Sequence, residues 1–205
     1  MRREWFFLLI SLLIITLSLT YISSQSSFSD DNLANDAYSD SQINLPIYFE
    51  ANIGQVNAPD NDIQPEFVAR GAGYTLFLSA DKSVFTIQQP EASLSTLEMS
   101  LAGSNPTAQI SGEEQQRAVS HYLASSDSRG YSNVPYYGRV RYQEVYDGID
   151  LIYYGNQQQL QYDFVVAPNA DPAAIRMDFD LLDNMELDSN GNLLLHVGGE
   201  TMRQR

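Results

Sequence analysis

Apolar and polar residues alternate most clearly at residues 160–166, where the large apolar side chains Leu160, Tyr162, Phe164 and Val166 occupy every second position. This period of two places one face of a β-strand on a core and the other face towards water. A second β-rich run, residues 149–154, precedes it, and the short polar connection 155–159 begins with glycine. The pattern predicts a central antiparallel β-hairpin.

Further short runs of the same kind recur along the chain, with turn residues between them. Residues 108–110 are expected to return beside 97–101, and Asn190-Gly191 predicts a tight hairpin between 185–187 and 193–197. The other predicted strands are residues 47–51, 67–70, 74–78, 84–87, 175–179 and the run beginning at Glu200. The fold class is therefore all-β, an antiparallel β-sandwich built from short hairpins.

Helical signals are scarce and short. Residues 113–123 could form one or two turns, and Asp171-Pro172 combines an N-cap residue with proline at the first helical position. We expect at most one or two short helical turns.

The N-terminus has the pattern of an export signal. Arg2 and Arg3 precede an apolar run at residues 5–22, and small residues follow it. We assign residues 1–26 to a signal peptide, with an uncleaved N-terminal membrane anchor as the alternative, because the run reaches the minimum length of a membrane-spanning helix. Residues 27–42 form a flexible acidic, serine-rich linker, and residues 43–205 form the β-sandwich domain, expected to be truncated at its C-terminal end.

Composition narrows the chemistry. The net charge of −15, from 11 basic and 26 acidic residues, argues against nucleic acid as a partner because phosphates would be repelled. The absence of cysteine excludes disulfides, thiolate zinc sites and a cysteine nucleophile. His121 and His196 are the only histidines and are far apart in the sequence, so a zinc site is not expected. We predict no catalytic residues, no metal and no cofactor.

Several segments resemble a known family. LPIYFEANIGQ, FVARGAGYTLFLS, YDGIDLIYYG and LQYDFVVAPNADP are similar, in this order, to the N-terminal domain of bacterial SBBP-repeat (β-propeller repeat) proteins, and the resemblance covers residues 43–205. It implies an exported bacterial cell-surface or secreted protein in which this domain precedes propeller-type repeats, and it implies no biochemical activity. The chain departs from the pattern by carrying Tyr131, without a tryptophan, at residues 124–132, and by ending before any repeat.

Tyrosines form the densest candidate ligand face. Tyr136, Tyr137, Tyr142, Tyr153 and Tyr154 lie in or near the predicted hairpin and could stack on a glycan or bind a protein. The alternative, which we favour, is that their rings pack within a β-sheet.

Acidic residues offer weaker candidates. Residues 188–192 carry oxygen side chains at alternate positions, as calcium loops do, but an Asn-Gly turn explains the same residues and is favoured. A calcium site at Asp147, Asp150 and Asp163 is a second alternative.

Charged side chains elsewhere have competing interpretations. Glu50 and Glu144 are the first choices for a glycosidase carboxylate pair, although chance explains any such pair in so acidic a chain. Arg70, Arg139 and Arg141 are expected to pair with local carboxylates.

The sequence favours a non-catalytic structural or interaction module of an exported bacterial multidomain protein. Its expected partners are other domains of the same longer chain, and extracellular glycan or protein. The alternative is an extracellular glycan-binding or glycan-cleaving domain that uses the tyrosine face and paired carboxylates.

Overall fold

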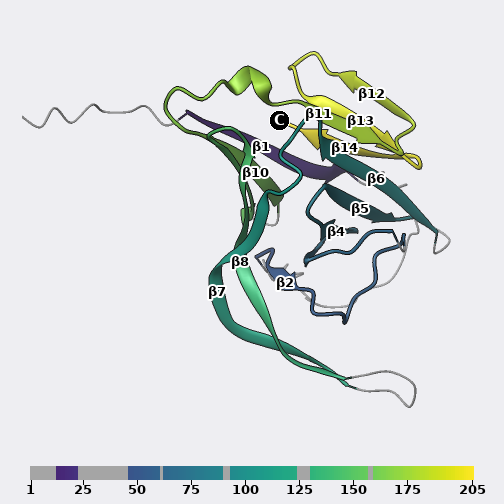
Figure 1. Cartoon of the computed structure of the whole chain (residues 1–205). Helices are drawn as coiled ribbons and strands as arrows, with labels where there is room; N and C mark the ends of the chain where they lie inside the picture. Colours follow the sequence, from purple (N-terminus) through teal and green to yellow (C-terminus); the bar gives the residue numbers. More distant parts are fainter. Residues whose placement is uncertain (1–12, 23–45, 61, 90–92, 124–129, 157–158) are drawn as a thin grey trace, which may run out of the picture.

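The fold is a strongly curled antiparallel β-sheet (Figure 1). The computed structural model describes residues 46–60, 62–89, 93–123, 130–156 and 159–205, together with the backbone of residues 13–22. Every pair of neighbouring strands runs antiparallel, and a 3-10 turn at Pro172–Ala174 is the only helical element within these ranges. The prediction of an all-β antiparallel fold is confirmed.

Fourteen strands make up the sheet. In chain order they are β1 Leu13–Ile22, β2 Phe49–Ala51, β3 Phe67–Gly71, β4 Tyr74–Leu78, β5 Lys82–Gln88, β6 Leu94–Leu101, β7 Gln109–Tyr122, β8 Tyr131–Tyr146, β9 Ile149–Asn156, β10 Gln159–Val166, β11 Met177–Asp180, β12 Asn184–Leu187, β13 Leu193–Val197 and β14 Glu200–Gln204. Their spatial order is β11-β6-β5-β4-β3-β2-β8-β9-β10-β1-β14-β13-β12, and β7 pairs with β8 outside this path.

The curl brings the two ends of the sheet together around one core. Leu97 and Met99 of β6 belong to the same buried cluster as Leu195 and Val197 of β13. At the β13–β14 turn, Gly198 lies so close to Ser95 of β6 that a Cβ atom at this position would overlap the serine side chain. The layered packing therefore comes from one continuous sheet that folds over its own apolar face.

The predicted central hairpin is formed by β9 and β10. In β10 every second residue is buried, and Phe164 is 1% exposed. Tyr162 pairs with Tyr153 in the ladder, so both rings point into the core. The strands extend to Asn156 and from Gln159, which makes the connection shorter than the predicted 155–159; residues 157–158 lie outside the described ranges.

The second predicted hairpin is also confirmed. Met185–Leu195 and Leu187–Leu193 are register pairs of β12 and β13. The Asp188 carboxylate accepts hydrogen bonds from the backbone N–H groups of Asn190 and Asn192 and from the Asn192 side-chain amide. The favoured turn interpretation of residues 188–192 agrees with this geometry, because the carboxylate is already occupied by the turn.

The structure corrects the prediction for residues 108–123. Residues 113–123 are not helical: residues 109–122 form β7, which pairs with β8 on both sides of an irregularity between Gln115 and Val119. Residues 108–110 do not return beside 97–101 either, since β6 pairs with β5 and β11. Residues 113–118 include good helix formers, but Glu113 and Gln115 pair with Arg139 and Tyr137 of β8, and these ladder contacts hold the segment in an extended conformation.

The long hairpin of β7 and β8 is here named the β7–β8 arm, and its outer end extends away from the rest of the sheet (Figure 1). Arg141 of β8 fixes the base of the arm. Its guanidinium lies 2.6 Å from the Glu113 carboxylate of β7 and 2.8 Å from the Asp150 carboxylate of β9. Charge-assisted hydrogen bonds of this kind fix orientation because the guanidinium is a rigid planar donor.

Two short sequence signals in the C-terminal part of the chain also have a counterpart in the structure. The 3-10 turn confirms the Asp171-Pro172 signal, since the Asp171 carboxylate caps the backbone N–H of Ala173 at 2.9 Å. β14 confirms a strand beginning at Glu200.

Within the ranges that the structure describes, no helix has the length and hydrophobicity needed to cross a membrane.

Part of the predicted leader has a place in the sheet. The backbone of residues 13–22 forms β1, which lies between β10 and β14 (Figure 1). Residues 1–12 and the predicted linker at 27–42 lie outside the described ranges.

Candidate functional site

The connection between β2 and β3, residues 52–66, is the longest segment without regular structure in the described part of the domain. Its ends are held together by the Asn52 backbone N–H, which donates to the Glu66 carbonyl at 2.7 Å and so extends the β2–β3 ladder. Compact surface loops with adjoining ends are Ω-loops, and loops longer than about 12 residues are frequently functional. We call residues 52–66 the Ω-loop.

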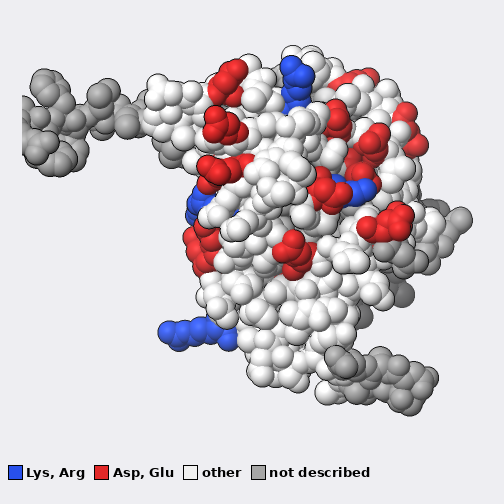
Figure 2. Space-filling view, in the orientation of Figure 1, with Lys and Arg blue, Asp and Glu red and all other residues white. Residues whose placement is uncertain are grey.

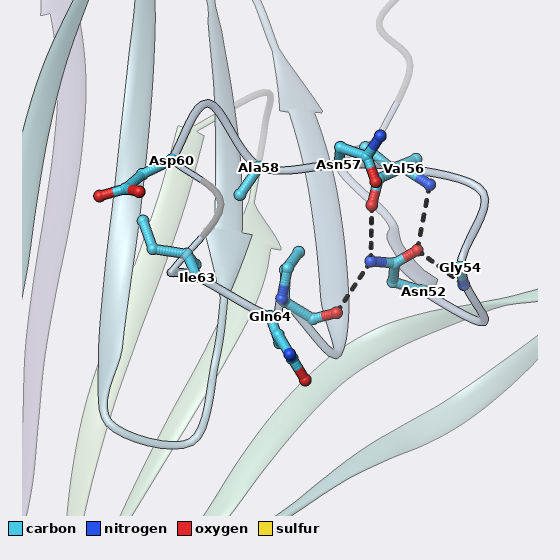
Figure 3. Close-up of a pocket in the computed structure, with 9 residues that line it drawn as sticks. Asn52, Gly54, Val56, Asn57, Ala58, Asp60, Ile63 and Gln64 are labelled. Atoms are coloured by element: carbon cyan, nitrogen blue, oxygen red, sulfur yellow. Dashed lines mark hydrogen bonds between the residues drawn. The ribbon is translucent and has the colours of Figure 1, made fainter.

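The Asn52 side chain organises the interior of the Ω-loop (Figure 3). Its amide nitrogen donates to the carbonyls of Val56 and Pro65, each at 2.9 Å. Its amide oxygen accepts from the backbone N–H groups of Gly54 and Val56, each at 3.2 Å. Gly54 has a φ of 109°, a conformation that glycine adopts without strain. These bonds replace the secondary-structure bonds that the loop backbone lacks.

The inner side of the Ω-loop covers the outer face of the neighbouring strands. Ala58 and Ile63 are buried against Val68, Phe77 and Val84, which form a small apolar cluster separate from the main core. This contact anchors the middle of the loop, because apolar area is removed from water there.

A cavity of about 390 Å³ lies in the Ω-loop (Figure 3). It is lined by Asn52, Gly54, Val56, Asn57, Ala58, Asp60, Ile63, Gln64 and Pro65. Asn57, Asp60 and Gln64 are polar residues of this lining, so polar groups of the loop border the cavity and can hydrogen-bond to an uncharged polar ligand.

Directly beside the loop, Glu50 of β2 is a fully buried carboxylate, with 0% exposure. Its Oε1 accepts hydrogen bonds from the Tyr122 hydroxyl at 2.6 Å and from Gln55 Nε2 at 2.9 Å. Its Oε2 accepts from Arg70 Nη1 at 2.9 Å and from the Tyr136 hydroxyl at 3.2 Å. The donors come from β7, the Ω-loop, β3 and β8, so one carboxylate joins four segments of the chain. We call these five side chains the Glu50 junction.

Electrostatics favour the ionised form of Glu50. Burial opposes ionisation, but the hydrogen bonds from Tyr122, Gln55 and Arg70 outweigh it, so the pKa of Glu50 is lowered. Burial and the bond to Glu50 both raise the pKa of Tyr122, which keeps this phenol protonated as a donor. The junction is thus a carboxylate–guanidinium pair completed by neutral donors, and it has the character of a structural brace.

The structure divides the predicted tyrosine face and so corrects it. Tyr142 and Tyr153 are 5% and 0% exposed, and their rings pack edge to face with centroids 5.9 Å apart. Their hydroxyls are used internally, by the Ser79 carbonyl and the Ser83 hydroxyl respectively. These two tyrosines belong to the core and cannot form part of an exposed ligand face.

The other three tyrosines are half-buried and point to different partners. Tyr136 belongs to the Glu50 junction, and Tyr137 packs edge to face on Phe67 with centroids 5.7 Å apart. Tyr154 lies under the Arg139 guanidinium, 5.6 Å from its ring centroid. The favoured interpretation, that the rings pack within the sheet, agrees with these contacts.

The acidic candidates are not brought together. Glu144 is exposed on β8, eight residues from Tyr136, which pairs with Glu50; this corresponds to roughly 26 Å of strand. Both carboxylates of a glycosidase must reach the substrate, whereas Glu50 is closed off from solvent by its hydrogen bonds to the protein, so Glu50 and Glu144 do not form such a pair. Across the described residues, no group of three or more His, Asp or Glu is placed to hold a metal ion.

Nearly every other candidate has an internal partner. Asp150 pairs with Arg141, and Asp163 accepts a hydrogen bond from Tyr154 at 3.2 Å. The two histidines lie on different strands: His121 accepts from the Asn133 backbone N–H, and His196 contacts Thr201 and Glu186. Arg70, Arg139 and Arg141 each pair with a carboxylate, which confirms the prediction for the arginines.

Asn52, Gln55 and Tyr122 were not predicted from the sequence. For Asn52 a signal exists, because asparagine followed two positions later by glycine is typical of turns. No local signal identifies Tyr122, whose partner Glu50 lies 72 residues away in the sequence.

The curled sheet and the Glu50 junction define an all-β domain in which a buried carboxylate braces a surface loop against a projecting hairpin. The chain belongs to a family of domains of unknown function, DUF7948, whose model matches residues 49–205. The match includes every strand from β2 to β14 and leaves β1 outside. Searches of curated proteins and of solved structures found no match.

Proposed function

We propose that this domain is a non-catalytic structural or interaction module of an exported bacterial cell-surface or secreted protein. The observation that carries the proposal is the Glu50 junction. Its carboxylate is closed off from solvent and accepts four hydrogen bonds from the protein itself, so it serves to hold the Ω-loop and the β7–β8 arm in one fixed arrangement. Rigid presentation of loops on a β-scaffold is how many binding modules work.

The surface charge supports this interpretation. Figure 2 shows Asp and Glu side chains spread over the visible face, with few Lys and Arg among them. Such a surface repels nucleic acid and keeps an exported protein soluble. The resemblance to SBBP-repeat proteins supports the further proposal that the module acts beside propeller-type repeats of the same chain.

Export is tested by protease shaving of intact cells that produce the full chain. We expect the domain to be digested without lysis, because the leader-like N-terminus directs it outside the cytoplasm. A cytoplasmic protein of the same cells serves as the control and should survive until lysis. A domain that stays protected as long as this control would contradict export.

Glycan binding is the second candidate, and the polar lining of the Ω-loop cavity favours it. Asn57 and Gln64 would donate to and accept from sugar hydroxyls. If a polysaccharide panel yields a ligand by calorimetry, N57A and Q64A are each expected to weaken binding about tenfold, which corresponds to about 1.4 kcal/mol. Q143A changes an exposed glutamine on β8 and should leave affinity unchanged; equal losses in all three variants would place the ligand elsewhere.

A further inference from the structure

β1 comes from residues 13–22, which belong to the segment that the sequence predicts to be a leader. Seven of its residues pair with β10, from Leu13 opposite Val166 to Leu19 opposite Leu160. Four pair with β14, from Leu19 opposite Gln204 to Ile22 opposite Thr201. β1 is therefore the strand that connects β10 to β14, and without it these strands share no ladder in the described structure. We call its position the β1 slot.

The sequence of residues 13–22 fits the slot at a period of two. Leu13, Ile15, Leu17, Leu19 and Tyr21 alternate with residues that include two threonines and a serine. Their register partners are Val166, Phe164, Tyr162, Leu160 and Met202, all of them buried. The apolar series thus occupies the register positions opposite core-facing residues, as the alternation of a half-buried strand requires.

The same residues belong to the apolar run expected to direct export. A segment that is cleaved off, or that enters a membrane, cannot also lie between β10 and β14. The family match leaves residues 13–22 out while containing both flanking strands. Removal of β1 would leave two facing strand edges with unpaired N–H and C=O groups, on β10 and β14, which is a strong template for strand addition.

We propose that the β1 slot is a strand-acceptor site. Its occupant after loss of the leader is a partner polypeptide that presents an extended segment with apolar side chains at alternate positions. This segment adds antiparallel to both β10 and β14, so that main-chain hydrogen bonds supply affinity and the alternate positions supply specificity. Residues 13–22 hold the site until then. The proposal rests on the proposed export in one respect: export is the event that removes residues 13–22 from the β1 slot.

The test uses the full chain with a specific protease site introduced within the linker at residues 27–42 and cut after folding. The released N-terminal segment should remain bound during gel filtration. A labelled peptide with the sequence of residues 13–22 and lysine tails should then displace it. A peptide of the same composition, reordered to lose the alternation, should bind at least about tenfold more weakly. Equal binding of the two peptides, or loss of the segment with no peptide binding, would overturn the proposal.

A cysteine pair gives a second, independent measurement in a chain without native cysteine. Ser18 and Gln161 are register partners, so the double variant S18C/Q161C should form a disulfide in the folded, uncut protein. If the protein is first cut in the linker and its N-terminal segment is exchanged for the peptide, this disulfide should no longer form. S18C with Q143C is the matched control, because β8 is separated from β1 by β9 and β10. Failure of the first pair to cross-link more than the control would also reject the slot. Both measurements use purified protein, so their outcome is independent of the protease-shaving test of export.

Discussion

F164A is expected to lower the free energy of unfolding by about 3–5 kcal/mol, the usual cost of deleting a large aromatic side chain from a core. Phe164 is 1% exposed in β10, and its ring packs edge to face on Tyr162 with centroids 6.1 Å apart. The cavity left by the truncation lies among residues held by a continuous sheet, so little relaxation can fill it. Urea unfolding followed by far-UV circular dichroism measures this loss of stability.

Q161A provides the control on the same strand. Gln161 lies on the opposite face of β10, where its side chain is half-buried, and its removal should change the free energy of unfolding by no more than about 0.5 kcal/mol. Similar losses in F164A and Q161A would show that the two faces of β10 are not distinguished as described.

E50A is expected to destabilise the domain by about 2–4 kcal/mol. The reason is the loss of four hydrogen bonds, which leaves the half-buried Tyr122, Gln55 and Tyr136 without this acceptor. The loss should stay below the largest values for buried ion pairs, because the Arg70 side chain is 49% exposed and can be rehydrated. E98A removes a carboxylate that pairs with Lys82 near the surface and should cost at most about 1 kcal/mol.

The pH dependence of the same junction has a defined sign. The folded pKa of Glu50 is lowered, so its contribution to stability is fully present above the unfolded pKa and is lost as pH falls through the folded pKa. E50Q cannot titrate at this position. The stability difference between wild type and E50Q should therefore be largest near neutral pH and shrink in acid. A difference that is constant from pH 7 to pH 3 would contradict an ionised Glu50.

Local patterns predicted those parts of the fold that are specified by neighbouring residues. The alternation at residues 160–166 predicted both that β10 is a strand and which of its faces is buried. Asn190-Gly191 predicted the position of a hairpin, because few residues tolerate the conformation of its turn. Residues 113–118 show the limit of such reasoning, since good helix formers lie in β7. Their conformation is decided by pairing with β8, which a local window does not contain.

The candidate site was predicted only in part for the same reason. Glu50 was singled out as a carboxylate, but for catalysis, and its role as a brace depends on Arg70, Tyr122 and Tyr136, which are 20, 72 and 86 residues away. The division of the tyrosines between core and junction follows from the curl of the sheet. No single-strand pattern determines that curl, because it results from the packing of all strands around one core.

The register of β1 has a consequence for the order of folding. Leu19 pairs with both Leu160 and Gln204, so this strand can dock only after nearly all of the described chain has been made. Contacts between such distant residues form late, because loop-closure entropy must be overcome before they contribute any stability. The hairpins from β3 to β10 join residues close in sequence and can assemble first. We therefore expect β1 to dock late in folding, so that its residues are not held between β10 and β14 until the rest of the sheet has assembled.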